Sequence, residues 1–242
     1  MPSKKSKGTA LITGAAQRIG RSIALSLADQ GFNIAIHCHR SQKEALKLMD
    51  LIRKKGVKCA IFICDLSDEK TTVSLISQVY KEFPDLNILV NNASIFYPSG
   101  LSTADLKSLD QNWAVNFRAP FILTCELARL ARKGLVINLL DTNIVRNKTS
   151  HFGYLLSKKM LFEFTKMAAV ELGPYIRVNG ICPGLILAPS GKEHKYLERR
   201  AEKLPLKKVG NISNITKSVQ FLIENDFLTG EVIFNDGGEQ LI

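Results

Sequence analysis

The chain has no long apolar run and no paired cysteine motif. No apolar stretch approaches the roughly 20 residues that a membrane-spanning helix needs. The five cysteines are scattered and odd in number, which predicts incidental thiols in a reducing compartment rather than a disulfide framework or a metal site. The basic start, MPSKKSKG, leads directly into a short apolar stretch and a glycine turn. We therefore expect a basic tail over residues 1–7, no signal peptide, no bound metal and a cytoplasmic location.

The chain also lacks a nucleic-acid motif, although its formal net charge is +11. Lysines and arginines are spread along the sequence without interleaved aromatic residues. We expect a basic surface that favours small anionic molecules, with specific nucleic-acid binding as the alternative. No repeat or linker divides the 242 residues, of which 45% are hydrophobic. This length and composition suit one α/β domain over residues 1–242.

One stretch, TGAAQRIG at residues 13–20, organises the first part of the chain. It joins a short apolar strand over residues 8–12 to a helix over residues 21–30, and a second apolar strand follows. Such a unit is typical of a dinucleotide-binding site, in which Gly14 adopts the tight turn and Gly20 lets the helix pack close to the strand. The free N–H groups at the helix N-terminus then face a pyrophosphate. An ordinary strand–turn–helix with two glycines is the alternative.

Apolar runs and helical patterns alternate through most of the chain. The alternation predicts an α/β fold with a single doubly wound, Rossmann-type parallel sheet of about seven strands and helices on both faces. Ligands of such sheets bind beyond the carboxyl ends of the strands. Besides the first unit, the expected strands cover residues 33–38, 58–64, 88–90, 135–140, 177–181 and 232–235, and the expected helices cover residues 42–55, 69–83, 103–132, 152–172 and 215–224.

The segment HCHRS, which follows the second strand, contains no acidic residue. An enzyme that uses NAD usually carries an Asp or Glu there to accept a hydrogen bond from the ribose 2′-hydroxyl. Arg40 with His39 and Ser41 suits a 2′-phosphate instead, and Arg18 in the glycine turn adds a second cation. The alternatives are a basic surface loop or a metal pair of His37 and His39, and we expect no metal there. The segment predicts a preference for NADP(H).

Polar residues also follow the third and fourth strands. Asp65 can accept a hydrogen bond from an adenine amino group or cap the next helix. The segment Asn91–Ser94 can bind backbone and ribose where the chain leaves the sheet, or form an ordinary turn. Asn116 stands among apolar residues of the helix expected over residues 103–132. It is therefore either a buried hydrogen-bonding group or a residue on the helix surface.

Three ionisable residues follow the fifth strand, namely Asp141, Tyr154 and Lys158. Tyr154 and Lys158 lie one helical turn apart on the same face. A phenol titrates at about pH 10, and a nearby ammonium stabilises the phenolate. Lys158 is therefore expected to lower the pKa of Tyr154 toward neutrality and to hydrogen-bond a ribose. An exposed Tyr–Lys pair without function is the alternative.

Together and in this order, these elements resemble the short-chain dehydrogenase/reductase family over nearly the whole chain. The resemblance rests on the glycine turn, Asp65, NNAS at residues 91–94, Asn116, the YxxxK pair Tyr154 and Lys158, Pro183-Gly184, Thr229-Gly230 and Asp236-Gly237-Gly238. It implies an NADPH-dependent oxidoreductase that assembles as a homotetramer. The implied cofactor-binding residues are Gly14, Arg18, Ile19, Gly20, His39, Arg40, Ser41, Asp65, Leu66, Asn92, Ala93, Ser94, Tyr154, Lys158, Pro183 and Gly184, and the implied catalytic residues are Asn116, Asp141, Tyr154 and Lys158.

Two departures from the family pattern narrow the resemblance. The family usually has Gly where this chain has Arg18, and Ser where it has Asp141. Both substitutions, with HCHRS and NNASIFYP, are similar to the pteridine reductases, and the bacterial dihydromonapterin reductases are similar too. In that group a Phe, here Phe96, stacks on the pterin. The implied substrate contacts are Arg18, Ser94, Phe96, Asp141 and Tyr154.

The resemblance implies reduction of a dihydropterin such as dihydrobiopterin or dihydromonapterin, or of dihydrofolate. A flat pterin would lie between Phe96 and the nicotinamide. NADPH would supply a hydride to a ring carbon, while Tyr154, with Asp141 and Lys158, would supply a proton to a ring nitrogen.

Two other functions are weighed against this one. A carbonyl reductase, for example of 3-oxoacyl thioesters, is disfavoured by Asp141 in place of Ser. A non-catalytic NADP-binding regulatory protein is disfavoured by the intact Tyr154, Lys158 and Asn116.

A substrate lid is expected over residues 185–208. The family often carries a Thr shortly after the Pro-Gly pair, and none occurs between Leu185 and Gly191. The charged run over residues 192–203 is expected to be a solvated helix rather than a recognition surface.

Overall fold

The computed structural model describes residues 6–97, 99–103, 105–148, 150–188 and 194–242. Within these residues seven strands form one sheet in the order β3-β2-β1-β4-β5-β6-β7, and every neighbouring pair is parallel. The order reverses between β1 and β4, so a crevice opens there at the carboxyl ends. The predicted fold class is confirmed. The strands are β1 (Thr9–Ile12), β2 (Asn33–Cys38), β3 (Cys59–Ile63), β4 (Leu86–Asn91), β5 (Gly134–Leu139), β6 (Ile176–Pro183) and β7 (Val232–Asn235).

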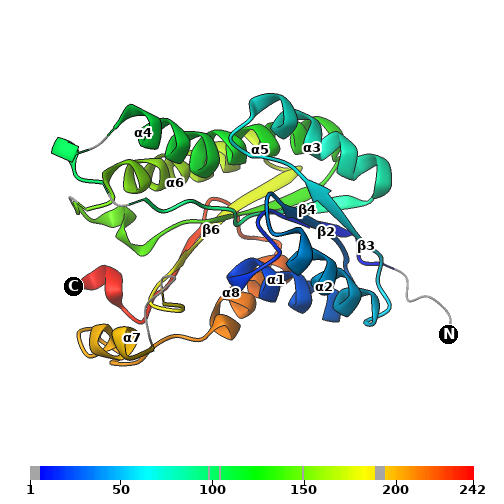
Figure 1. Cartoon of the computed structure of the whole chain (residues 1–242). Coiled ribbons are helices and arrows are strands. Elements are labelled where there is room, and N and C mark those ends of the chain that lie inside the picture. Colours follow the sequence, from blue (N-terminus) through cyan, green and yellow to red (C-terminus); the bar gives the residue numbers. More distant parts are fainter. Residues whose placement is uncertain (1–5, 98, 104, 149, 189–193) are drawn as a thin grey trace.

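Helices cover both faces of the sheet (Figure 1). One face carries α1, α2 and α8, and the other carries α3, α4, α5 and α6, while α7 lies apart, beside the C-terminal end of the chain. None of the helices among the described residues has the length and apolar character that crossing a membrane requires. The helices are α1 (Arg18–Asp29), α2 (Gln42–Arg53), α3 (Glu69–Glu82), α4 (Leu106–Trp113), α5 (Ala119–Leu130), α6 (Phe152–Leu172), α7 (His194–Ala201) and α8 (Ile212–Glu224).

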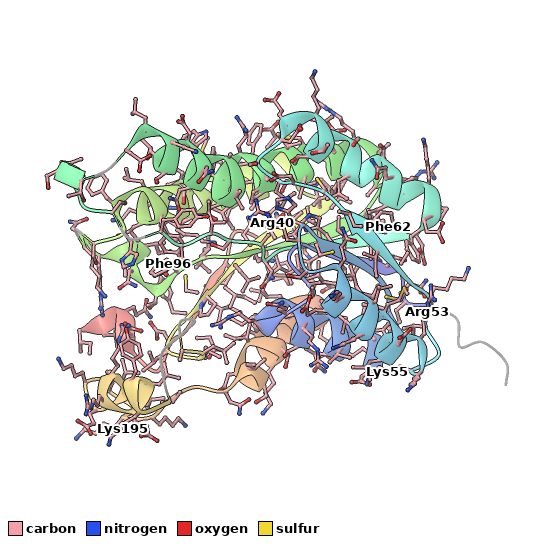
Figure 2. All side chains as sticks on the ribbon, in the orientation of Figure 1. Arg40, Arg53, Lys55, Phe62, Phe96 and Lys195 are labelled. Atoms are coloured by element: carbon pink, nitrogen blue, oxygen red, sulfur yellow. The ribbon has the colours of Figure 1, made fainter. Side chains whose placement is uncertain are left out.

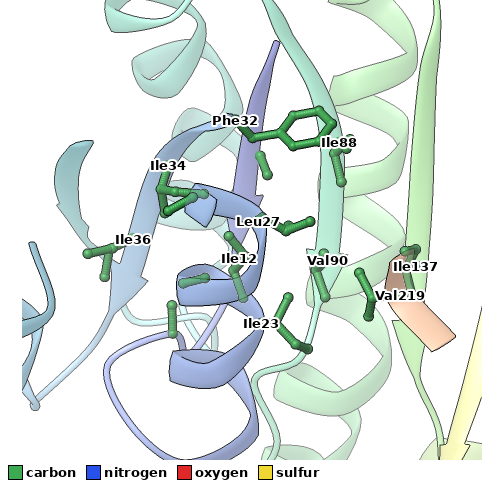
Figure 3. Close-up of a cluster of buried hydrophobic side chains, with 14 of the residues drawn as sticks. Ile12, Ile23, Leu27, Phe32, Ile34, Ile36, Ile88, Val90, Ile137 and Val219 are labelled. Atoms are coloured by element: carbon green, nitrogen blue, oxygen red, sulfur yellow. The ribbon is translucent and has the colours of Figure 1, made fainter. Parts of the chain in front are cut away.

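The strands are apolar on both sides because helices bury both faces of the sheet. Ala10 and Ile12 of β1 belong to the cluster under α1, α2 and α8, and this cluster includes Ile23 and Val219 (Figure 3). Leu11, which points the other way, belongs to the opposite cluster under α3, α5 and α6. This arrangement explains why the strands read as continuous apolar runs in the sequence.

The single helix predicted over residues 103–132 is wrong in detail. Asp105 caps α4 by accepting a hydrogen bond from Ser108 N at 2.8 Å, and the segment Ala114–Arg118 is a π-helical turn that leads into α5 at Pro120. A π turn adds a residue to one helical turn and changes the direction of the side chains around it. It therefore sets where Asn116 points.

The charged run at residues 192–203 contains a helix, as predicted, and this helix is α7. Leu197 and Ala201 of this helix are buried and pack with Leu185 and Leu204. The helix is therefore not simply solvated. Closure of residues 185–208 over a substrate stays a prediction. Residues 189–193 of this segment, which include Pro189 and Gly191, lie outside the described residues, as do Pro98 and residues 1–5 of the basic tail.

Candidate active site

Two adjoining cavities open at the carboxyl ends of the strands. The first cavity, of about 430 Å³, is lined by the glycine turn and by the ends of β2, β3 and β4. The second cavity, of about 530 Å³, is lined by the end of β5, the start of α6, the end of β6 and α7. The volume of each lies in the range of small-molecule sites.

The structure distributes the predicted site residues between these cavities. The first cavity is lined by Gly14, Arg18, Ile19, Gly20, His39, Arg40, Ser41, Asp65, Leu66, Asn92, Ala93 and Ser94. The second is lined by Phe96, Asp141, Tyr154, Pro183 and Gly184. Lys158 and Asn116 line neither, and the predicted substrate contacts Arg18 and Ser94 line the first cavity rather than the second.

The glycine turn packs tightly against the end of β4. A Cβ atom on Gly20 would lie 2.5 Å from Asn92 Nδ2 and 2.6 Å from Gly14 O, so no larger residue fits there. Asn92 Nδ2 donates to Thr13 O at 2.8 Å and to Gly14 O at 3.2 Å. Asn92 thus holds the glycine turn by hydrogen bonds to its backbone, as predicted for this segment. The N-terminus of α1 lines the first cavity.

His37 has a role that the sequence pattern does not indicate, since the pattern suggested only an improbable metal pair with His39. Its Nδ1 accepts a hydrogen bond from Gly14 N at 3.1 Å, and its Nε2 lies 3.0 Å from Cys64 O. The first bond requires Nδ1 without a proton, so Nε2 carries one and donates to Cys64 O. Burial lowers the pKa of His37 to about 4. A neutral imidazole therefore ties the glycine turn to β2 and β3.

The segment that follows β2 carries basic groups to the rim of the first cavity. Arg40 is exposed, and its guanidinium makes no hydrogen bond within the part of the chain that the structure describes; Figure 2 shows it above the carboxyl end of the sheet. His39 Nε2 lies 3.6 Å from Asp65 Oδ2. Arg18 has a left-handed backbone with φ of 53°, and its Nη2 donates to Ala188 O at 2.9 Å.

Asp65 does not cap the next helix. Its Oδ1 accepts from Ser67 N at 2.9 Å and from Ser67 Oγ at 2.7 Å, whereas Asp68 caps α3 by accepting from Thr71 N. Partial burial opposes ionisation, but these hydrogen bonds and the neighbouring cations hold the pKa of Asp65 below its usual value. A charged Asp65 therefore faces the first cavity beside His39.

In the second cavity a phenol and a carboxylate form a hydrogen-bonded pair. Tyr154 Oη donates to Asp141 Oδ2 at 2.8 Å. The other carboxylate oxygen, Oδ1, accepts from Asn143 N and from Asn143 Nδ2, each at 2.7 Å. Because Asn143 holds Oδ1, Oδ2 is left to face Tyr154. Asp141 thus both caps the turn after β5 and contacts the phenol.

The predicted lowering of the pKa of Tyr154 by Lys158 is wrong. Burial, and then the negative charge of Asp141, raise the pKa of Tyr154 well above its ordinary value. Lys158 Nζ donates to Leu139 O at 2.7 Å and lies 5.9 Å from the centre of the Tyr154 ring. Burial also lowers the pKa of Lys158 to about 8, against the attraction of Asp141. Tyr154 therefore keeps its proton at neutral pH.

Asn116 is a buried hydrogen-bonding group, one of its two predicted alternatives. Its Oδ1 accepts from Ile95 N at 2.9 Å and its Nδ2 donates to Ile95 O at 3.0 Å. Nδ2 also lies 3.2 Å from Ser157 Oγ on α6. The side chain joins the loop that follows β4 to the helix that carries Tyr154. Asn116 therefore positions a loop beside the first cavity and a helix beside the second, although it lines neither cavity itself.

Phe96 lies in the wall of the second cavity, on the side of the molecule where α7 lies (Figure 2). Its ring is stacked on His151, with centroids 4.0 Å apart and planes at 15°. It also meets the Tyr154 ring edge-on at 4.6 Å. Sequence reasoning missed His151, although its place just before Tyr154 puts it near the same end of α6.

Residues of α7 and of the C-terminal turn η4 (Glu239–Leu241) complete the second cavity. Arg200 Nη2 lies 3.1 Å from Glu239 Oε1, and Arg200 Nη1 donates to Tyr196 Oη at 3.2 Å. All three residues line the cavity. No local signal in the sequence marks them, because they come from segments far apart in the chain.

Comparisons with known proteins agree with a nucleotide-binding reductase. A family model described as Enoyl-(Acyl carrier protein) reductase matches residues 14–240. A 3-oxoacyl-[acyl-carrier-protein] reductase FabG from Staphylococcus epidermidis is 30% identical over 239 residues, which is 95% of this chain and 98% of that protein.

Solved structures give the same picture. FolM Alternative dihydrofolate reductase 1 from Brucella canis, complexed with NADP, has a TM-score of 0.92 and 33% identity over 98% of this chain and 95% of that chain. A blue fluorescent protein from a metagenomic library, in complex with NADPH, has a TM-score of 0.89 and 27% identity over 96% of this chain and 98% of that chain.

Proposed function

The chain belongs to the short-chain dehydrogenase/reductase family, and from this premise we propose that it reduces the C=N bond of a pteridine with NADPH. It is an NADP-dependent oxidoreductase, as HCHRS predicted, since its solved neighbours hold NADP or NADPH. The observation that carries the pteridine proposal is the 2.8 Å hydrogen bond between Tyr154 Oη and Asp141 Oδ2. Most members of the family carry Ser at the position of Asp141.

The first cavity fits the adenosine half of NADP(H). The close packing of Gly20 against Asn92 leaves the N-terminus of α1 open to a pyrophosphate. Arg40 offers a guanidinium without a hydrogen-bond partner in the described chain, and Ser41 lines the same rim. These groups would hold a 2′-phosphate by charge-assisted hydrogen bonds.

Replacing Arg40 by Ala is expected to weaken NADPH binding by about 10- to 100-fold, because a hydrogen bond to a charged group contributes roughly 1.5–3 kcal/mol. NADH binding should change little, since NADH has no 2′-phosphate. Titration of both cofactors by nicotinamide fluorescence measures the two Kd values. Equal losses for NADPH and NADH would contradict the 2′-phosphate assignment. Replacing Arg53, a distant surface arginine of α2 that donates to Cys59 O, serves as the matched control.

The second cavity can deliver a proton to a ring nitrogen. NADPH, when bound, supplies the hydride. Tyr154 keeps its proton because burial and Asp141 raise its pKa, so the phenol is a proton donor held in place. Asp141 Oδ2 shares that proton and can pass on a replacement from the cavity. A carboxyl group is suited to exchange protons with nitrogen, whereas a Ser hydroxyl mainly donates to a carbonyl oxygen.

An exposed aromatic ring in the wall of the second cavity supports a flat substrate. Phe96 is 52% exposed and lines the cavity with Tyr154. Its position next to the phenol would place a stacked heterocycle within reach of the proton donor. Buried Lys158, 2% exposed, holds the backbone of Leu139 just before Asp141 and would also hydrogen-bond the nicotinamide ribose.

A carbonyl reductase of 3-oxoacyl thioesters is the second candidate, favoured by the 30% identity to FabG. The test is NADPH oxidation by the purified protein with dihydrobiopterin, dihydromonapterin, dihydrofolate and acetoacetyl thioester. We expect turnover with one or more of the pteridines and little with the thioester. Turnover with the thioester alone would establish the second candidate instead.

We also propose that the protein assembles as a homotetramer in the cytoplasm. The outer face of α4, α5 and α6 exposes large apolar side chains, including Trp113, Phe121, Met167 and Val170. An apolar face of this kind is typical of a contact between subunits. Light scattering of the purified protein measures its mass directly.

A further inference from the structure

His151 holds an unusual backbone conformation at the start of α6. Its φ is 60° and its ψ is 45°, and its side chain makes no capping hydrogen bond to the helix. Side chains rarely adopt this left-handed region outside Gly, although Asn, Asp and His are enriched there. Such a conformation persists only where the surroundings fix it, and it is found at functional sites.

The contacts of its ring show what fixes His151. The imidazole is stacked on Phe96 at 4.0 Å, with the two planes at 15°, and Phe96 meets Tyr154 edge-on at 4.6 Å. Three rings from two separate segments thus form one continuous wall of the second cavity. Phe96 itself lies in a loop without regular secondary structure. Its ring is therefore held by these two ring contacts.

The stack leaves Phe96 only one face for a ligand. His151 covers one face and the Tyr154 ring lies perpendicular to the Phe96 ring, yet 52% of Phe96 stays exposed. Burial lowers the pKa of His151, so its imidazole is neutral at pH 7 and the stack carries no charge. The remaining face of Phe96 is a flat apolar surface at a fixed position next to the phenol.

We infer that His151 is a positioning residue for substrate: it fixes the ring of Phe96 so that its free face selects planar heterocycles. This inference rests on the proposed function. A flexible acyl chain gains little from a fixed aromatic surface, whereas a bicyclic heterocycle stacks on it over its whole area. His151 therefore contributes to the choice of substrate class without touching the reacting atoms.

The test compares two substitutions of His151. His151→Asn tolerates the left-handed backbone but removes the ring, and His151→Tyr keeps a ring to stack on Phe96. We expect His151→Asn to raise KM for the preferred dihydropterin about fivefold, which is the effect expected from the loss of one aromatic ring contact. Its kcat and its Kd for NADPH should stay near the wild-type values, because Tyr154 and the first cavity are unchanged. His151→Tyr should restore KM.

Each other outcome is decisive. An unchanged KM in His151→Asn, with normal pteridine turnover by the wild-type protein, would overturn this inference and leave the proposed function standing. A lower KM would show that His151 competes with substrate for Phe96. A fall in kcat alone, or failure of His151→Tyr to restore KM while its thermal stability matches that of the wild type, would assign the residue to the fold. No pteridine turnover by the wild-type protein would overturn both proposals.

Discussion

Replacing Tyr154 by Phe is expected to lower kcat for pteridine reduction by about 10³-fold, within the usual range for loss of a general acid. The hydroxyl is the group that donates to Asp141 Oδ2 at 2.8 Å, and the raised pKa of Tyr154 keeps the proton there at neutral pH. The phenyl ring of the variant retains the edge contact with Phe96. The shape of the cavity, and therefore KM, should change little. Stopped-flow measurement of NADPH oxidation gives the rate.

Two controls separate proton delivery from binding. The Kd for NADPH of Tyr154→Phe should stay within about threefold of the wild-type value, because loss of a transition-state interaction lowers kcat and not affinity. Asp141→Asn keeps the shape of the side chain but removes the carboxylate, and because the two Asn143 donors would retain its one oxygen, its NH2 group would face Tyr154 Oη. It should slow reduction by about 10²-fold. A Tyr154→Phe rate within tenfold of wild type would contradict the assigned role.

Acid should destabilise the protein through His37. This side chain is 2% exposed, and burial lowers its pKa from 6.5 to about 4. Between these pH values the unfolded chain binds a proton that the folded chain does not, so stability is complete above pH 6.5 and falls as the pH decreases toward 4. One pH unit of pKa difference corresponds to about 1.4 kcal/mol, and the total loss is therefore about 3 kcal/mol.

The measurement is the free energy of unfolding in urea at fixed protein concentration, from pH 7 to pH 4. His37→Asn retains an acceptor for Gly14 N but cannot titrate, so its stability should be lower at pH 7 and nearly flat across this range. His39→Asn, at an exposed neighbouring histidine, should keep the wild-type slope. Parallel curves for the wild type and His37→Asn would show that another group causes the acid sensitivity.

The sequence predicts the framework of the fold because that framework depends on local patterns. β2 and α6 begin and end at the predicted residues, since apolar runs and helical periodicity are properties of short segments. The carboxyl ends of parallel strands share one edge, so topology alone brings HCHRS and the NNAS segment to the first cavity.

Features that depend on contacts between distant segments could not be predicted in this way. At the π turn, the side chain of Asn116 hydrogen-bonds to Ile95 and to Ser157, which lie far from it in the sequence. The pKa of Tyr154 depends on its burial and on the carboxylate of Asp141 beside it. The ammonium of Lys158 is instead bound to the backbone carbonyl of Leu139. Sequence spacing gives the identity of such neighbours but not their directions.

The bond from Arg18 to Ala188 O has a kinetic consequence. It joins the glycine turn to the segment that supplies Leu185 and Leu187 to the second cavity. The family resemblance implies that Arg18 contacts the cofactor, and a guanidinium that turns toward a cofactor phosphate releases Ala188. Entry of the nucleotide then reshapes the place where the heterocycle binds. This coupling favours a compulsory order of addition, in which the dinucleotide binds first and the reduced heterocycle leaves before the oxidised dinucleotide.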